Sequence, residues 1–226
     1  MSRASQTVAQ YWDTYKPNRG GEIPSAPTVT GFEWTQHGPG HGPGADWLGA
    51  PATALELGAA ECREAAYLAR TGVRVTAVDF SAAQVERARA WWRDTPGLDI
   101  VQAEACGYLQ TANARYDAVY SVWGAVWFTD PEQLFPLVLA RLNPGGVFAF
   151  SQAEPLEGFY GPEGMYGNGF NGPRLTVVRW SYAPEQWSDL LKRHGFSGIE
   201  AHILSAPDPR DVGTLMVRAS APEGSP

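Results

Sequence analysis

Short apolar runs divide the chain, and turn residues bound most of them. Continuous apolar runs of this length are typical of strands that are buried on both faces of a sheet. Two later strands are predicted near residues 199–204 and 214–218. The five early strands are predicted at residues 53–57, 74–78, 100–103, 116–122 and 147–151.

The segments before, between and after these runs predict helices. In the first predicted helix, at residues 7–15, four side chains share one face by the spacing i, i+3, i+4 and i+7: Val8, Tyr11, Trp12 and Tyr15. Strands that alternate with helices predict an α/β fold, here a Rossmann-like, doubly wound, mainly parallel seven-stranded sheet with helices on both faces. The predicted helices cover residues 7–15, 61–71, 82–92, 131–142 and 184–194.

Composition and charge exclude several classes of protein. The net charge is −7, and the 17 basic residues form no cluster, so no nucleic-acid partner is expected. Two cysteines without metal-ligand spacing predict neither a disulfide framework nor a metal site. No apolar run is long enough to span a membrane, and the first residues lack the apolar core of a signal peptide. A cytoplasmic location is the simplest expectation.

Candidate ligand-binding residues follow the predicted strands in order. In parallel sheets of this kind, ligands bind outside the carboxyl ends of the strands. Gly58 follows the first strand, and Asp79 follows the second, 21 positions later. An acid about 20 residues beyond such a glycine can accept hydrogen bonds from a ribose. Glu104 follows the third strand, and Trp123 and Trp127 follow the fourth.

The glycine turn favours a nucleoside over a dinucleotide. Ala60 and Cys62 occupy the positions where a dinucleotide site has its second and third glycines. The methyl group of Ala60 would face a pyrophosphate, whereas a ligand without phosphates avoids this conflict. Glu56 would repel a pyrophosphate but suits a cation that carries an ammonium group. An NAD enzyme is therefore disfavoured.

Several motifs together resemble a known family. In chain order they are LELGAAECREAAYLARTGVRVTAVDFS, VQAEA, YDAVYSVWGAVWFTDP, LNPGGVFAFS and YAPEQWSDLLKRHGF, which cover roughly residues 54–196. They are similar to the ordered motifs of class I S-adenosylmethionine-dependent methyltransferases. Glu56 and Gly58 fit the family pattern of an acid followed by alternating glycines, while Ala60 and Cys62 depart from it.

The resemblance implies roles for individual residues at the cofactor, S-adenosylmethionine. The backbone from Gly58 to Ala60 would line its methionine part, and Glu56 would act on its ammonium group. Asp79 would accept hydrogen bonds from the ribose hydroxyls, and Phe80 would pack on the adenine.

The resemblance also implies a second set of contacts. Glu104 and Ala105 would meet the adenine edge, and Ser121 to Trp123 would border the sulfonium and the substrate. Tyr11 is the candidate to cover the cofactor carboxylate, because aromatic residues of the N-terminal helix do so in some members. No metal is expected, and the product would be S-adenosylhomocysteine.

The chain is expected to form one domain, because a single core can grow to about 250 residues. Within it we expect an N-terminal helix and Gly/Pro-rich cap (1–50), a cofactor-binding core (51–153), an aromatic lid loop (154–182) and a C-terminal helix with strands (183–219). The lid loop is too apolar for a linker, and its Tyr160 and Tyr166 are candidate substrate contacts, as are Trp123 and Trp127. The alternative is a packed surface loop.

The expected chemistry needs little more than positioning. The methyl group of a sulfonium is already activated, so orientation and the exclusion of water would supply most of the rate. A base is required only when the acceptor carries a proton. His37 and His41, in the loop sequence TQHGPGHGPG, are the candidate bases, and the alternative is that both are solvated loop residues.

The leading hypothesis is methyl transfer to an O or N atom of a small aromatic or hydrophobic molecule. Two alternatives remain at this stage. One is a methyltransferase that acts on a protein, a peptide or a nucleic acid. The other is a catalytically silent protein that only binds the cofactor.

Overall fold

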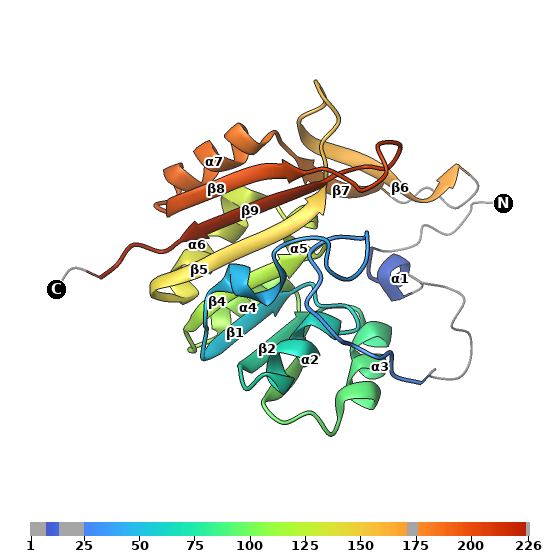
Figure 1. Ribbon diagram of the computed structural model, residues 1–226, viewed down its shortest axis with the longest axis vertical. Coiled ribbons are helices and arrows are strands. Elements are labelled where there is room, and N and C mark those ends of the chain that lie inside the picture. Colours follow the sequence, from blue (N-terminus) through green and yellow to red (C-terminus); the bar gives the residue numbers. More distant parts are fainter. Residues whose placement is uncertain (1–7, 14–24, 171–175, 225–226) are drawn as a thin grey trace.

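The structure is a computed structural model that describes residues 8–13, 25–170 and 176–224. Its main sheet has seven strands in the order β3-β2-β1-β4-β5-β9-β8 (Figure 1). The first five strands are parallel, and β9 pairs antiparallel with both β5 and β8. The prediction of a mainly parallel, seven-stranded α/β sheet is confirmed. The strands are β1 (Thr53–Leu57), β2 (Arg74–Asp79), β3 (Leu98–Gln102), β4 (Tyr116–Val122), β5 (Leu142–Ala153), β8 (Ser197–Leu204) and β9 (Thr214–Ser220).

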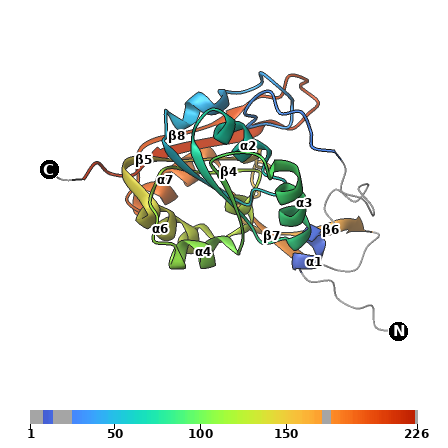
Figure 2. The ribbon, with the colours of Figure 1, turned by 90° about the horizontal axis from the view of Figure 1, so that it is seen from below.

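Helices cover both faces of this sheet (Figure 2). Apolar residues of α2 (Arg63–Arg70) and α3 (Ala82–Trp92) pack on one face. Residues of α4 (Ala105–Thr111), α6 (Pro131–Arg141) and α7 (Pro184–Arg193) pack on the other. Strand order reverses where β1 lies between β2 and β4, which is the place where open α/β sheets bind ligands.

The Gly/Pro-rich segment 25–48 packs where a further helix would otherwise cover the sheet. Phe32, Trp34 and Leu48 join the apolar cluster that contains α2, and Trp34 is fully buried. The Trp34 Nε1–H donates a hydrogen bond of 2.7 Å to the carbonyl of Gly44, at the start of the short 3-10 helix η1 (Gly44–Leu48). The segment is therefore part of the core.

The expected lid loop is in part a β-hairpin, which corrects the expectation of a segment without secondary structure. Strands β6 (Gly161–Phe170) and β7 (Thr176–Ser181) form a separate antiparallel sheet. Glu163 and Arg179 lie directly opposite each other and form an ion pair of 3.0 Å. The glycines of β6 conceal the strand in the sequence, because glycine weakens strand patterns while backbone pairing still satisfies the peptide groups.

Several element boundaries differ from the prediction. Strand β5 begins at Leu142, because residues 143–146 bulge out between the pairs Tyr116–Leu142 and Ala118–Val147. The short helices α4 and α5 (Ala125–Phe128) were not predicted. Helix α1 extends over Val8–Asp13 within the predicted range.

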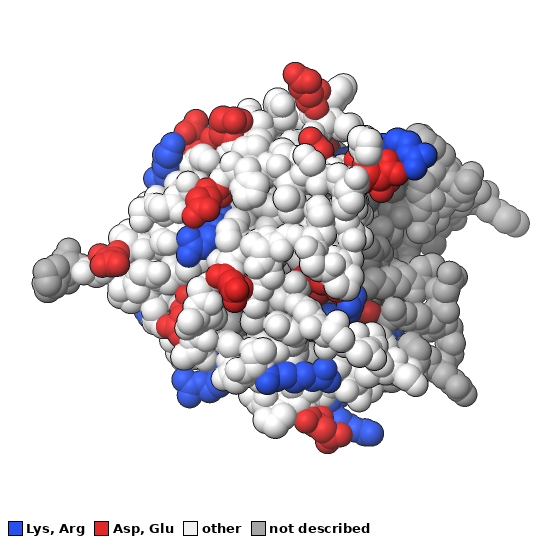
Figure 3. All heavy atoms as spheres, viewed as in Figure 1, with Lys and Arg blue, Asp and Glu red and all other residues white. Residues whose placement is uncertain are grey.

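On the face shown in Figure 3, Lys and Arg side chains are scattered among Asp and Glu and form no broad basic area. Among the described helices, none has the length and apolarity needed to cross a bilayer.

Candidate functional site

A cavity of about 570 Å³ lies at the carboxyl ends of β1, β2 and β4. Its size is within the usual range for small-molecule sites. Helices α1 and α5 and strand β7 also line it, so segments far apart in the sequence form its walls. Among the residues expected at a cofactor or substrate, those on the cavity wall are Glu56, Gly58, Ala60, Asp79, Phe80, Glu104, Ala105, Trp123 and Trp127.

Two glycines allow the floor of the cavity to form. Gly58 has a φ of +73°, and a Cβ atom there would lie 2.2 Å from the backbone nitrogen of Ala125. A Cβ atom at Gly124 would lie 2.6 Å from the carbonyl oxygen of Gly58. The turns after β1 and β4 therefore touch backbone to backbone, which no larger residue permits. The sequence analysis found Gly58 but missed Gly124, which ends the run SVWG.

Three residues with side chains adopt left-handed backbone conformations beside the cavity. They are Ala60, Cys62 and Trp123, with φ values of 45°, 56° and 50°. A left-handed conformation costs an L-residue about 1–2 kcal/mol, and glycine avoids this cost. Ala60 and Cys62 therefore keep the turn geometry that glycines adopt freely. For Trp123, strain of this kind at a cavity wall is typical of a functional position.

Asp79 is buried at the end of β2 and faces the glycine turn. Its Oδ2 accepts a hydrogen bond of 2.8 Å from the N–H of Ala60, and its Oδ1 accepts one of 2.9 Å from the N–H of Ser81. Burial raises the pKa of the Asp79 carboxyl, and these backbone hydrogen bonds oppose the rise. The carboxylate is thus held in a fixed orientation at the cavity wall.

Glu56 is, with Glu61, one of the two most deeply buried acids of the cavity. Its side chain is 2% exposed, and its Oε2 accepts hydrogen bonds from the N–H of Ala65 at 3.1 Å and the hydroxyl of Tyr120 at 3.3 Å. Burial, followed by the negative charge of Glu64, raises the pKa of Glu56 well above its usual value. A cationic ligand would favour the charged form of this carboxyl.

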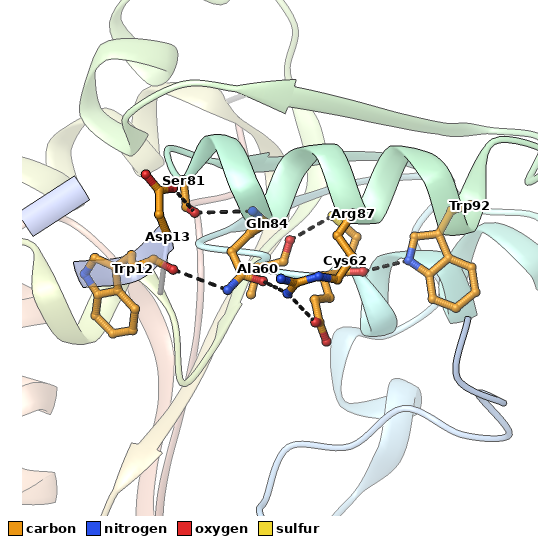
Figure 4. Close-up of polar contacts among 9 residues, drawn as sticks. Trp12, Asp13, Ala60, Cys62, Ser81, Gln84, Arg87 and Trp92 are labelled. Carbon is orange, nitrogen blue, oxygen red and sulfur yellow. Dashed lines mark hydrogen bonds and ion pairs between the residues drawn. The ribbon is translucent and has the colours of Figure 1, made fainter. Parts of the chain in front are cut away.

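One part of the cavity wall is strongly acidic. Arg63 is on the wall, and Arg87 forms an ion pair of 2.8 Å with Glu61. Figure 4 shows Arg87 reaching from α3 toward the turn that holds Ala60 and Cys62. The cavity-lining carboxylates are Glu56, Glu61, Glu64, Asp79 and Glu104. A ligand with two positive charges, such as a sulfonium with an ammonium group, would be attracted by these carboxylates, whereas a pyrophosphate would be repelled by them.

Another part of the cavity wall is aromatic. Trp123 and Trp127 pack edge to face with ring centroids 5.6 Å apart, and Trp12 of α1 packs edge to face on Phe128 at 4.8 Å. The Arg179 guanidinium lies over the Trp127 ring at 5.4 Å and so attaches the hairpin to α5. Flat, apolar groups are the ligands that such walls accommodate.

The buried segment around Trp34 fixes Trp123. The carbonyl oxygen of Trp34 accepts hydrogen bonds from Trp123 Nε1–H at 3.1 Å and from the Ser151 hydroxyl at 2.7 Å. The backbone N–H of Trp123 donates to the carbonyl of Ser151 at 2.8 Å. These bonds hold the strained Trp123 backbone in place.

Tyr11 and Ser121 are near the cavity but not on its wall. Tyr11 is 7% exposed and packs with Val177, while the next residue of α1, Trp12, lines the cavity. The Ser121 hydroxyl donates to the carbonyl of Leu57 at 2.7 Å, and the N–H of Val126 donates to that hydroxyl at 3.3 Å. Ser121 therefore joins two turns beneath the cavity and does not face a ligand.

The expected lid tyrosines do not contribute to the described wall. Tyr160 is 42% exposed just before β6 and lies outside the cavity. The backbone of Tyr166 belongs to β6, but its side chain lies outside the described part of the structure. The hairpin instead reaches the cavity through Val177 and Val178 of β7.

His37 and His41 lie away from the cavity, contrary to their assignment as candidate bases. His37 Nε2 is 3.0 Å from the carbonyl oxygen of Val212, and His41 Nε2 is 3.0 Å from that of Ser205. Both rings thus attach the Gly/Pro-rich segment to the connection between β8 and β9. In this arrangement they cannot take a proton from a ligand in the cavity.

Sequence reasoning missed Trp12, Gln84 and Phe128 among the cavity residues. Trp12 was placed on the apolar face of its helix, but one helix position cannot be assigned to a wall without knowing where the helix docks. Within the described residues, no group of three or more His, Cys, Asp or Glu side chains could hold a metal ion.

Comparison with known proteins gives a family match and related folds. The methyltransferase domain family model matches residues 55–150. Trans-aconitate 2-methyltransferase of Paracidovorax citrulli (strain AAC00-1) is 32% identical over 83 residues. That alignment covers 37% of this chain and only 31% of the relative's own length.

Two solved structures share the fold. The 1,6-didemethyltoxoflavin-N1-methyltransferase of Burkholderia thailandensis aligns with a TM-score of 0.58 at 22% identity, over 78% of this chain and 73% of its own. The glycopeptide N-methyltransferase MtfA in complex with sinefungin aligns with a TM-score of 0.60 at 22% identity, over 79% of this chain and 83% of its own. Residues 55–150 therefore match the methyltransferase domain family model, and the chain shares its fold with these solved methyltransferase structures.

Proposed function

We propose that the chain transfers a methyl group from S-adenosylmethionine to an N or O atom of a small aromatic or hydrophobic molecule. The observation that carries this proposal is a cavity whose wall has both acidic and aromatic side chains. The acidic side chains suit a cationic cofactor, and the aromatic side chains suit a flat acceptor. The relative named for trans-aconitate and the structural neighbour named for 1,6-didemethyltoxoflavin both support a small acceptor.

Most of the residues expected at the cofactor line the cavity, whereas Tyr11 and Ser121 do not. Asp79, fixed by the N–H groups of Ala60 and Ser81, would accept hydrogen bonds from the ribose hydroxyls. Glu56 would bind the ammonium group, and Phe80 would pack on the adenine beside Glu104. When bound, S-adenosylmethionine supplies a methyl group that is already activated on its sulfonium.

The chain's own contribution to catalysis is orientation and the exclusion of water. Trp123 and Trp127 would hold the acceptor in line with the methyl group, and their ring faces attract a sulfonium by about 0.5–2 kcal/mol. Holding two reactants in a productive geometry can lower a barrier by about 7–11 kcal/mol. Because His37 and His41 lie away from the cavity, we propose an acceptor atom that carries no proton at neutral pH or loses it to solvent.

Calorimetry with S-adenosylmethionine tests the cofactor site. Asp79→Ala should weaken binding at least tenfold, because it removes charge-assisted hydrogen bonds worth about 1.5–3 kcal/mol. Asp208→Ala is the matched control: Asp208 also accepts a backbone N–H, from Arg210, but it does not line the cavity. Equal affinity in Asp79→Ala and in the unmodified protein would contradict the assignment.

Labelled methyl transfer tests the acceptor class. S-adenosylmethionine with an isotopically labelled methyl group is incubated with panels of small heteroaromatic amines, phenols and carboxylates and, separately, with peptides. Transfer to small aromatic molecules is the expected result. Transfer to peptides alone would contradict the proposed acceptor class, and cofactor binding without transfer to any acceptor would favour a silent binding protein.

A further inference from the structure

Helix α1 docks on the N-terminus of α3 through polar contacts (Figure 4). Asp13 Oδ1 accepts a hydrogen bond of 2.7 Å from the Ser81 hydroxyl and one of 3.3 Å from the N–H of Ala83. The Gln84 side chain donates to the carbonyl of Trp12 at 3.4 Å. A carboxylate at this position also interacts favourably with the positive end of the α3 dipole.

Ser81 connects this docking contact to the cofactor acid. Its backbone N–H donates to Asp79 Oδ1 at 2.9 Å, while its hydroxyl donates to Asp13 Oδ1 and accepts from the N–H of Gln84. Ser81 is fully buried, so it has no solvent to replace these partners. A shift of Ser81 would therefore disturb both Asp79 and Asp13.

The other side of α1 contacts the aromatic part of the cavity wall. Trp12 packs on Phe128 of α5, and Tyr11 packs against Val177 of β7. Val8 and Trp12 line the cavity themselves. Helix α1 thus bridges the acidic wall and the aromatic wall, and it forms part of the cover of the cavity between them.

We propose that Asp13 is a positioning residue that couples the docking of α1 to cofactor binding, acting through Ser81 on Asp79. The inference rests on the proposed function, because it takes S-adenosylmethionine or its product as the ligand of Asp79. A ligand that fixes the Asp79 carboxylate also fixes Ser81, which then presents its hydroxyl to Asp13. By linkage, a docked α1 must stabilise the bound ligand to the same extent.

The coupling sets how fast the cofactor exchanges. Because Val8 and Trp12 are part of the cover, we infer that the ligand leaves when α1 undocks, as in other enzymes with mobile covers. Loss of the Asp13 hydrogen bonds should therefore increase the dissociation rate of the ligand, while the ligand keeps its contacts with the rest of the cavity wall.

Dissociation kinetics of S-adenosylhomocysteine test this inference. Asp13→Ala should raise the dissociation rate about tenfold, because it removes the two hydrogen bonds that Asp13 accepts from Ser81 and Ala83. Asp13→Asn keeps an oxygen acceptor for Ser81 and Ala83 and should restore most of the slow dissociation. Asp208→Ala, which removes a carboxylate from the connection between β8 and β9, should leave the rate unchanged.

Amide hydrogen exchange supplies a readout that a merely structural role would not change. In the unmodified protein, S-adenosylhomocysteine should slow exchange in residues 8–13 as well as in the turn after β1. In Asp13→Ala, the ligand should still slow exchange after β1 but should no longer protect residues 8–13. Retained protection of these residues in Asp13→Ala, or an unchanged dissociation rate, would overturn the coupling.

The same measurements separate the two levels of inference. If the unmodified protein does not bind S-adenosylhomocysteine, both the proposed function and the coupling fail. If it binds and Asp13→Ala behaves like the Asp208→Ala control, only the coupling fails. Thermal unfolding of each variant without ligand shows whether the comparison is made between folded proteins.

Discussion

At the scale of single residues, the cavity contains acids that the fold keeps in an unfavourable environment. Glu56 and Asp79 are both buried, and burial raises the pKa of each. Folding therefore favours the neutral form of these carboxyls. Their contribution to stability is complete below the unfolded pKa and is lost as the pH rises through the higher folded-state pKa. A bound cation would favour the charged form of both carboxyls and so lower their pKa values.

Glu56→Gln should separate stability from binding. At neutral pH the variant should unfold at a higher temperature than the unmodified protein, because a neutral amide replaces a buried acid that folding disfavours in its charged form. The gain in unfolding temperature should shrink as the pH falls toward about 4, because the Glu56 carboxyl then becomes protonated in the unfolded chain as well as in the folded protein. Affinity for S-adenosylmethionine should fall about tenfold through loss of the charged partner of the ammonium group. Thermal unfolding across pH and calorimetry at neutral pH measure the two effects.

The variant Glu86→Gln is a suitable control, because Glu86 is exposed on α3. An equal rise in unfolding temperature for both variants would show that the gain reflects net charge and not the burial of Glu56.

The conformation of the turn after β1 was only partly predictable from its residues. The absence of glycine at Ala60 and Cys62 predicts a ligand without a pyrophosphate, and the acidic side chains of the cavity favour the same kind of ligand. The pattern did not reveal that both residues keep left-handed backbone angles. Backbone angles of this kind depend on tertiary contacts that outweigh the local strain, such as the hydrogen bond from Ala60 to Asp79.

At the scale of elements, two segments outside the alternating strands and helices help to build the core and the cavity wall. The segment 25–48 covers one face of the sheet, and through the carbonyl of Trp34 it holds Trp123 at the cavity. Strand β7 of the β6–β7 hairpin adds Val177 and Val178 to the cavity wall, where a plain loop was expected. The long buried strands and amphipathic helices were predictable because their apolar periodicity is local, whereas these segments gain order only from their partners.

Trp34→Ala should destabilise the protein by about 3–5 kcal/mol, as is typical for removing a buried aromatic side chain. The structural reason is that Trp34 is fully buried and also anchors its segment through Gly44. Denaturant unfolding measures the effect. Trp91→Ala, which truncates a half-buried tryptophan of α3, should cost less, and an equal loss in both variants would contradict the core role of segment 25–48.

At the scale of the whole molecule, ligand binding should stabilise the fold broadly because the cavity joins distant segments. Helix α1, the turns after β1, β2 and β4, helix α5 and strand β7 all contribute to one wall. A ligand that contacts several of these segments binds the folded state and not the unfolded chain. The unfolding temperature therefore reports on occupancy of the cavity.

S-adenosylhomocysteine at about one hundred times its dissociation constant should raise the unfolding temperature by roughly 5–10 °C, since this excess contributes about 2.7 kcal/mol. Differential scanning fluorimetry measures the shift. NAD at the same concentration should produce no shift, because the acidic wall repels a pyrophosphate. A larger shift with NAD than with S-adenosylhomocysteine would contradict the cofactor assignment.

The sequence by itself determined the seven strands of the main sheet, the longer helices, and the residues at the ends of β1, β2 and β4, because these features depend on local periodicity and on turn residues. Only the tertiary structure decided which side chains share the cavity. It placed Trp12 there instead of Tyr11, buried Ser121 beneath it, and drew His37 and His41 toward the connection between β8 and β9. The physical reason is that a cavity wall depends on how separate segments dock, and docking is set by contacts between residues far apart in the chain.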